Sequence, residues 1–171
     1  METLGYNLNI AEFRIEKTVT VGTRNFIAYF IHDYYPTRFE DVDEDIKRVR
    51  RVVYDFKDGR NSTIVANKIA TAITRRNLHW NNNPCICIIP ASTSSKTQIR
   101  YSEFCRLVAS SARILNGYSF ITNSVDREEM KGQASGDKIS TFSFNSNLYR
   151  GKTILLFDDV YTSGTSFKQT A

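Results

Sequence analysis

The spacing of apolar residues changes several times along the first half of the chain, and each change predicts an element. Between residues 11 and 35, apolar and polar positions alternate before Gly22-Thr23, and the stretch after this turn is rich in Phe, Ile and Tyr, which is typical of two strands joined by a turn. From residue 40 to 57, apolar positions recur at intervals of three and four, which predicts an amphipathic helix. Asp58-Gly59 follows as a helix-ending signal, and a second helix is expected over residues 63–76.

From Pro84 onward, short apolar runs alternate with polar and helical segments. The expected strands cover residues 85–89, 118–122, 139–144 and 154–157, a helix covers 102–115 and ends before Gly117, and polar loops cover 91–100 and 123–138. This alternation predicts an α/β protein with a mainly parallel sheet, right-handed crossovers and flanking helices. We expect two parts: an N-terminal β-hairpin with its helix over residues 1–60, and the α/β core over residues 61–171.

The composition fits one globular core. The chain has 171 residues, of which 41% are hydrophobic, enough to bury one core. It contains no run of about 18 apolar residues, and its N-terminus lacks the basic start and apolar stretch of a secretion signal. We therefore expect a cytoplasmic protein with no membrane partner. Cys85 and Cys87 lie on one face of an expected strand, and fit buried reduced thiols better than a metal site.

The net charge of +5 suits an anionic ligand, and it also suits nucleic acid. The densest basic cluster comprises Lys47, Arg48, Arg50 and Arg51. These residues fall on the expected amphipathic helix, so most of them should line its solvent face, and the acidic residues just before them complement the helix dipole. A solvated helix is favoured over a nucleic-acid patch, and nucleic acid stays a less favoured partner.

The most informative segment is the last expected strand and the turn after it. Residues 154–157 form a continuous apolar run, as a strand covered on both faces requires, and Asp158 and Asp159 follow at its carboxyl end. In open parallel sheets, ligands bind beyond the carboxyl ends of the strands. Hydroxyl groups and unhindered backbone N–H groups come next, where a helix begins, from Thr162, Ser163, Gly164, Thr165 and Ser166. Together, the carboxylates and the turn can hold a sugar phosphate.

Three other interpretations of this segment compete. A strand-turn-helix junction with an Asp, Ser or Thr cap uses the same residue types without any ligand. A Walker-type phosphate loop needs a lysine after its second glycine, and none follows Gly164, so that interpretation fails. Asp158 and Asp159 can also be taken as a magnesium site on their own, because carboxylates suit that ion, but the hydroxyl-rich turn is then unexplained.

A second loop leaves the carboxyl end of the strand over residues 85–89, so it should lie at the same edge of the sheet as Asp158. Backbone donors, hydroxyl groups and cations can bind pyrophosphate there. The residues concerned are Ala91, Ser92, Thr93, Ser94 and Lys96, with Arg100 at the start of the next helix. A loop rich in serine and threonine is a weak signal alone, and it gains weight from the segment at residues 154–166.

That segment resembles the phosphoribosyl-pyrophosphate (PRPP) motif of type I phosphoribosyltransferases: four apolar residues, Asp-Asp, two apolar residues, then Thr-Ser-Gly and a hydroxyl residue. The resemblance implies that Asp158 and Asp159 contact the ribose hydroxyls and support Mg²⁺ through water, while residues 162–166 wrap the 5-phosphate. It also implies that the loop at residues 91–96 receives pyrophosphate. Tyr161 departs from the motif, because the family usually has an aliphatic residue there.

In the resembled family, a flexible loop in the position of residues 123–138 closes over the reaction centre. The resemblance makes Arg127 and Lys131 candidate catalytic residues that meet the leaving group, although the stretch is also interpretable as an ordinary connection. The overall spacing is closest to the ComF-like, competence-associated branch over residues 84–168, and more weakly from Tyr34 to Gly59. The N-terminal zinc ribbon often found in that branch is missing, so zinc is not expected.

The function that the resemblance implies is transfer of a 5-phosphoribosyl group from PRPP to a nitrogenous base or amine, with release of pyrophosphate and with Mg²⁺ as cofactor. The alternative is a non-catalytic PRPP-binding module in DNA uptake or nucleotide-linked regulation. Family members continue through the next helix and at least one more strand, so the chain is expected to be a fragment or an unusually short homologue. An unpaired sheet edge would then make a homodimer a candidate assembly.

Overall fold

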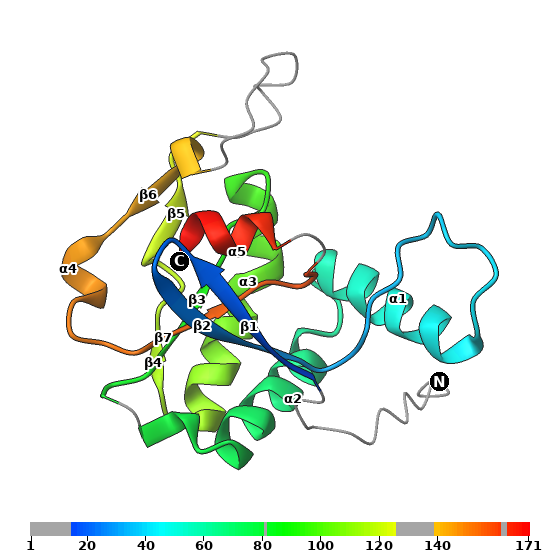
Figure 1. Cartoon of the computed structure of the whole chain (residues 1–171), viewed down its shortest axis with the longest axis horizontal. Coiled ribbons are helices and arrows are strands. Elements are labelled where there is room, and N and C mark those ends of the chain that lie inside the picture. The colour runs from blue at the N-terminus through cyan, green and yellow to red at the C-terminus, as the bar shows by residue number, and fades with distance from the viewer. Residues whose placement is uncertain (1–14, 81, 126–138, 162–163) are drawn as a thin grey trace.

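The computed structural model describes residues 15–80, 82–125, 139–161 and 164–171 (Figure 1). An antiparallel hairpin comes first, with β1 (Ile15–Val21) paired to β2 (Arg24–Phe30) in a register that sets Ile15 opposite Phe30. Gly22 takes a φ of 58° in the turn, a conformation that glycine adopts without strain. The predicted N-terminal hairpin is therefore confirmed.

Two amphipathic helices follow the hairpin; the first begins four residues later than predicted and ends where predicted, and the second lies within one residue of its predicted bounds. α1 (Glu44–Lys57) begins where the Asp43 side chain accepts a hydrogen bond from the Ile46 N–H at 2.8 Å. Gly59 ends the helix with a φ of 77°, and a Cβ at that position would lie 2.8 Å from Ile99 Cγ2. α2 (Ser62–Arg75) turns its alanines and two of its isoleucines, Ile69 and Ile73, into the core, whereas Ile64, which was predicted to point inward, is 38% exposed.

The central sheet has three parallel strands in the order β4, β3, β7. β3 (Cys85–Ile88) lies between β4 (Leu115–Asn116) and β7 (Ile154–Phe157). Along the outer side of β7, no strand of the described residues pairs. The fold is thus mixed α/β, with a small parallel sheet flanked by helices and an N-terminal antiparallel hairpin. The short remaining helices are η1 (Leu78–Trp80), η2 (Ile139–Thr141), α4 (Ser146–Tyr149) and α5 (Thr165–Thr170).

The helix after β3 starts earlier than predicted. α3 (Ser94–Ala112) begins at the end of a short turn, where the Thr93 hydroxyl accepts a hydrogen bond from the Lys96 N–H at 3.1 Å. The predicted loop over residues 91–100 and the predicted helix start at residue 102 were therefore wrong. The first buried position of α3 is Thr97, a polar residue, so the apolar periodicity that indicates a helix begins only one turn later, at Tyr101.

The region after α3 also differs from the prediction. α3 ends at Ala112, with Arg113 in the left-handed conformation, and the expected strand over residues 118–122 is replaced by two shorter ones. β4 joins the parallel sheet, whereas β5 (Ile121–Asn123) pairs antiparallel with β6 (Phe142–Phe144), a pair separate from that sheet. A short apolar run indicates a strand but not its partner, which explains the error. Residue 117, expected to end the helix, instead follows β4.

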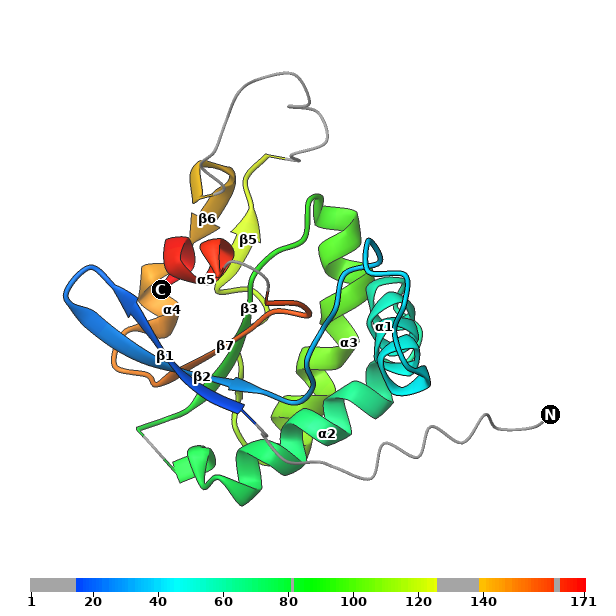
Figure 2. The ribbon, with the colours of Figure 1, turned by 45° about the vertical axis from the view of Figure 1, so that its right-hand side comes forward.

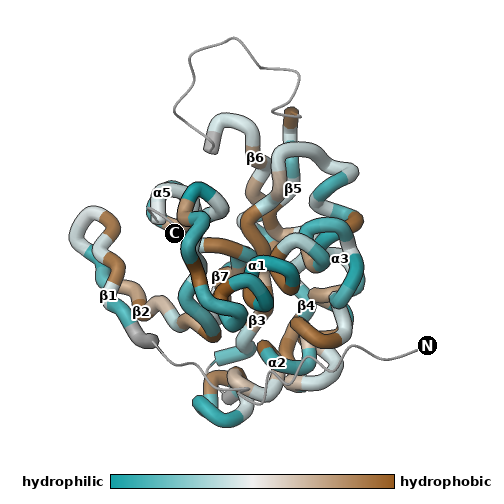
Figure 3. Tube along the Cα trace, turned by 90° about the vertical axis from the view of Figure 1, so that its right-hand side faces the viewer, coloured by the Kyte–Doolittle hydropathy of each residue, from teal (hydrophilic) through white to brown (hydrophobic). Residues whose placement is uncertain are grey.

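The core lies on both faces of β3, whereas β7, whose apolar run predicted a strand covered on both faces, is only half-buried, with Ile154 37% exposed. On one face, Ile86 and Ile88 pack with residues of α2 and α3, and Figure 2 shows these helices along one side of β3 and β7. On the other face, Cys85 and Cys87 pack with Phe120 and neighbouring residues. Their Sγ atoms lie 3.7 Å apart as free thiols, as predicted. Figure 3 shows the hydrophobic stretches of β3 and β7 in the interior.

The basic cluster on α1 is only partly a solvent face. Lys47 pairs with Glu44, and Arg48 pairs with Asp45, at exposed positions one turn apart. Arg50 instead donates hydrogen bonds to three backbone carbonyls, those of Tyr35, Pro36 and Phe39, each at 2.7 Å. It thereby fixes the segment after β2 against α1.

Among the described residues, no helix combines the length and the apolar character that crossing a membrane requires. The division of the chain between residues 60 and 61 stays a prediction.

Candidate functional site

Four aromatic rings from three elements form a cluster beneath the predicted site. Phe56 of α1 lies 5.9 Å from Tyr101 and 5.3 Å from Phe104, both of α3, and 6.0 Å from Phe157 of β7, measured between ring centroids. Edge-on packing of this kind adds to the stability that burial of the rings provides. We call these four residues the aromatic cluster. It joins the last turn of α1, the middle of α3 and the end of β7, and Figure 2 shows these segments approaching one another.

Each of three rings in the aromatic cluster is followed or preceded by a charged residue, so the cluster sets the positions of those charges. Lys57 follows Phe56, Arg100 precedes Tyr101, and Asp158 and Asp159 follow Phe157. We call Lys57, Arg100, Asp158 and Asp159 the charged cluster. Its members are far apart in sequence, and sequence reasoning assigned only the last three to a site. Lys57 was missed, and its sole signal was its place in the weakly matching stretch Asp-Phe-Lys-Asp-Gly.

Asp159 is the centre of the charged cluster. Its side chain is 7% exposed, and Arg100 Nη1 lies 2.8 Å from its Oδ2. Lys57 Nζ lies 4.0 Å from the same oxygen, at the outer limit of an ion pair and beyond hydrogen-bonding distance. The Arg100 Nε atom is buried and has no hydrogen-bond partner within the described residues. Asp159 thus faces two cations from different helices, one at hydrogen-bonding distance and one farther away.

Asp158 has a different environment from its neighbour. Its Oδ1 accepts hydrogen bonds from the Asp159 N–H at 2.9 Å and from the Tyr101 hydroxyl at 3.4 Å, and it makes no ion pair with any described residue. Burial, together with the nearby charge of Asp159, raises the pKa of Asp158 to about 7. Complete burial holds the pKa of Tyr101 well above its usual range, so its hydroxyl stays a neutral donor. The acidic pair thus combines a carboxylate that pairs with Arg100 and a carboxyl group whose pKa lies near neutrality.

The turn after β3 lies beside the acidic pair, as predicted. The Ile89 N–H donates to the Phe157 carbonyl at 3.0 Å, so the chain segments that leave β3 and β7 start together at one edge of the sheet. Two side chains fix the turn: the Ala91 N–H donates to Thr97 Oγ1 at 3.0 Å, and the Ala91 carbonyl accepts from Asn123 Nδ2 at 2.9 Å. Thr97 and Asn123 also bond to each other at 2.8 Å, and neither was predicted to belong to the site.

Only part of the predicted pyrophosphate loop is a loop. Ala91, Ser92 and Thr93 form the turn, whereas Ser94 and Lys96 belong to the first turn of α3. Arg100 lies further along the same helix and contacts Asp159. A helix N-terminus also favours anions, so the change from loop to helix start is compatible with anion binding, which stays a prediction for this segment.

The predicted 5-phosphate turn is described only from Gly164 onward, and Thr162 and Ser163 lie outside the described residues. Gly164 has a φ of 73° and precedes α5, which contains Thr165 and Ser166 in its first turn. A side chain on Gly164 would collide with the ring of Tyr161. That ring, which departs from the family motif, packs 5.2 Å from Phe30 of β2 and 5.7 Å from Phe167 of α5. It therefore connects the hairpin to the predicted phosphate turn.

Arg127 and Lys131, the predicted catalytic cations, also lie outside the described residues. In the part of the chain that the structure describes, no three His, Cys, Asp or Glu side chains gather as metal ligands. Mg²⁺ commonly uses one or two carboxylates together with substrate phosphates, so the acidic pair fits an ion that is shared with a ligand. Asp158 is the carboxylate better suited to this, since Arg100 occupies Asp159.

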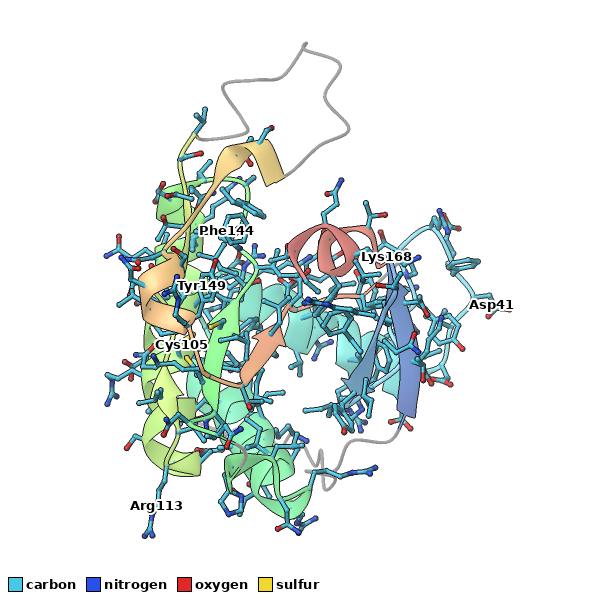
Figure 4. All side chains as sticks on the ribbon, turned by 60° about the vertical axis from the view of Figure 1, so that its left-hand side comes forward. Asp41, Cys105, Arg113, Phe144, Tyr149 and Lys168 are labelled. Atoms are coloured by element: carbon cyan, nitrogen blue, oxygen red, sulfur yellow. The ribbon has the colours of Figure 1, made fainter. Side chains whose placement is uncertain are left out.

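A cavity of about 630 Å³ lies between the hairpin, α1, α2 and β7, and reaches the acidic pair at one end. Its walls are mainly apolar and include Val19, Phe30, Val53 and Leu156, with Tyr34 near the acidic end. Figure 4 shows β7 and the hairpin with side chains drawn between them. Burial and a hydrogen bond with Tyr54 raise the pKa of Tyr34, and the charge of Asp159 adds to this effect. The segment after β2 therefore lies next to the site.

A scan against models of known protein families finds no match to this chain, and comparisons with curated proteins and with solved structures find none either.

Proposed function

We propose that this chain binds PRPP and transfers its 5-phosphoribosyl group to a nitrogenous base or amine, with release of pyrophosphate. The single observation that carries the proposal is the meeting of two loops at one edge of the parallel sheet. The acidic pair follows β7, the Ala91–Thr93 turn follows β3, and the hydrogen bond between Ile89 and Phe157 joins them. Carboxylate acceptors for sugar hydroxyls thus lie beside a turn and helix start that suit phosphate.

In the proposed complex, Asp158 and Asp159 accept hydrogen bonds from the ribose hydroxyls, and residues 162–166 bind the 5-phosphate. The turn at residues 91–93 and the start of α3 receive the pyrophosphate, and Arg127 and Lys131 meet the same group as it leaves. When bound, Mg²⁺ neutralises part of the phosphate charge. Displacement at the ribose C1 depends on positioning and electrostatic stabilisation, so it requires no nucleophile from the protein. These residue roles are the ones that the resemblance to ComF-like phosphoribosyltransferases implies, applied to the described fold.

Thermal unfolding and calorimetric titration with PRPP and Mg²⁺ at pH 8 test the binding step. We expect the thermal midpoint to rise at millimolar PRPP, and Asp158→Asn to weaken binding because it removes a charged acceptor. Asp41→Asn is the matched control, because Asp41 is an exposed carboxylate in the loop before α1 (Figure 4). A thermal midpoint that millimolar PRPP leaves unchanged would refute the proposal.

Pyrophosphate release across a panel of nucleobases and amines then tests the transfer step. Release that depends on one acceptor identifies the substrate. Tight PRPP binding without release for any acceptor would instead favour a non-catalytic PRPP-binding module.

A further inference from the structure

Lys57 is the one member of the charged cluster whose charge no close contact satisfies. Its ammonium lies 4.0 Å from Asp159 Oδ2, whereas Arg100 Nη1 lies 2.8 Å from the same oxygen. The Lys57 side chain is 31% exposed, and within the described residues its only ion pair is this long one. An ammonium group has three donors to place, so Lys57 keeps donors available on its exposed side.

The fold holds the base of this side chain in place. Phe56, the preceding residue, is 2% exposed within the aromatic cluster, and Gly59 closes the helix against Ile99. A lysine at a helix C-terminus is favoured by the helix dipole alone, which is the plainer explanation for its presence. The dipole does not explain why this lysine lies at a buried carboxylate that an arginine already neutralises.

The arrangement of charges around Lys57 favours an additional anion. Arg100 contacts Asp159 Oδ2 at 2.8 Å, which leaves the Lys57 ammonium as the cation of the cluster without a close carboxylate. A positive group in a partly buried position attracts an anionic ligand more strongly than it would in water.

We propose that Lys57 is a ligand-binding residue of the site and that its ammonium binds a phosphate oxygen of PRPP. This inference rests on the proposed function and adds to it a residue from outside the two predicted phosphate loops. PRPP carries phosphate oxygens at two ends, the 5-phosphate and the diphosphate, and the chemistry of recognition is the same for both. Ribose 5-phosphate and inorganic pyrophosphate each present one end alone, so they distinguish the two.

Calorimetric titrations of wild type and Lys57→Met with PRPP, ribose 5-phosphate and inorganic pyrophosphate, all with Mg²⁺, test the assignment. We expect Lys57→Met to weaken PRPP binding roughly 10-fold, the size of one charge-assisted hydrogen bond. Binding of whichever single-ended probe contacts Lys57 should weaken equally. Lys57→Arg should retain most of the affinity, because it keeps the positive charge.

Lys47→Met is the matched control, because Lys47 lies on the same helix, pairs with Glu44 at 2.7 Å, and sits roughly 15 Å from Lys57 along the helix axis. It should bind all three probes as wild type does, and its thermal midpoint shows what loss of a lysine charge costs in folding. If wild type binds PRPP and Lys57→Met binds every probe equally well, the Lys57 assignment is overturned and the proposed function survives. If wild type binds pyrophosphate but not PRPP, the proposed function fails, and a weaker affinity of Lys57→Met for pyrophosphate still supports an anion-binding role for Lys57.

Discussion

Replacement of Asp158 by asparagine should stabilise the protein, and the gain should increase with pH. Burial and the charge of Asp159 raise the pKa of Asp158 from 3.8 to about 7. The folded state therefore holds this proton more tightly than the unfolded state does. Its contribution to stability is fully present below pH 4, declines as the pH rises, and is lost once the pH passes about 7.

The size of the effect follows from the shift in pKa. A change from 3.8 to about 7 corresponds to roughly 4 kcal/mol at full ionisation, as an upper limit for a group whose surroundings relax. Asparagine resembles the neutral carboxyl in shape, and its amide oxygen can still accept the hydrogen bond from the Asp159 N–H. The difference in unfolding free energy between Asp158→Asn and wild type should therefore grow by at most about 2.5 kcal/mol between pH 5 and pH 8.

Urea unfolding at pH 5, 6, 7 and 8, followed by circular dichroism, measures this difference directly. Asp41→Asn serves again as the control, and its difference from wild type should stay constant over the same range, because Asp41 is exposed. Other titrating groups are common to the proteins and cancel in the comparison. An Asp158→Asn difference that does not change with pH would show that the carboxyl is already ionised at pH 5, and the reasoning about its environment would be wrong.

Three further predictions concern the site and its support. PRPP affinity of the wild type should rise about tenfold from pH 6 to pH 8 as Asp158 ionises. In Asp158→Asn, only the pH dependence that comes from titration of PRPP itself should remain. Gly117→Ala should lower the free energy of unfolding in urea by about 1–3 kcal/mol, because a Cβ there would lie 2.5 Å from both Cys85 Sγ and Cys87 Sγ. Gly22 has open space around it and a φ of 58°, so Gly22→Ala reports only the cost of the backbone conformation. Arg50→Met should destabilise the protein by about 1–3 kcal/mol, because three carbonyls lose their donor, whereas the exposed Arg51→Met should be nearly neutral.

Local sequence patterns predicted the elements that are marked by a continuous apolar run or by regularly spaced apolar residues. The runs at residues 85–88 and 154–157 are parallel strands, the first buried and the second half-buried, and α1 and α2 lie within a few residues of where their periodicity indicated. The early start of α3 escaped prediction because its first buried position, Thr97, is polar and takes its place through hydrogen bonds. The pairing of β5 with β6 escaped because a three-residue strand does not encode its partner.

The site was predictable as far as the topology determines it. Parallel strands end at the same edge, so the neighbourhood of Asp158 and the Ala91 turn followed from the expected sheet. The contact of Arg100 with Asp159, and the approach of Lys57, depend on how three aromatic rings from distant segments pack. Such packing leaves no local signature in the sequence, which is why Lys57 was recognised only in the structure.

The outer side of β7, along which no described strand pairs, lies close to the candidate site. The Cys85 N–H bonds to the Thr153 carbonyl and the Ile89 N–H to the Phe157 carbonyl, so the alternating ladder directs the amides of Ile154 and Leu156 away from β3. An extended segment that pairs with those amides would lie close to Phe157. This residue precedes Asp158 and belongs to the aromatic cluster. If the proposed PRPP site is correct, any change that such pairing makes in PRPP affinity must equal the change that PRPP makes in the affinity of the pairing, because linkage between two binding events is reciprocal. Where the pairing segment belongs to a second copy of the chain, such linkage would make the apparent PRPP affinity depend on protein concentration.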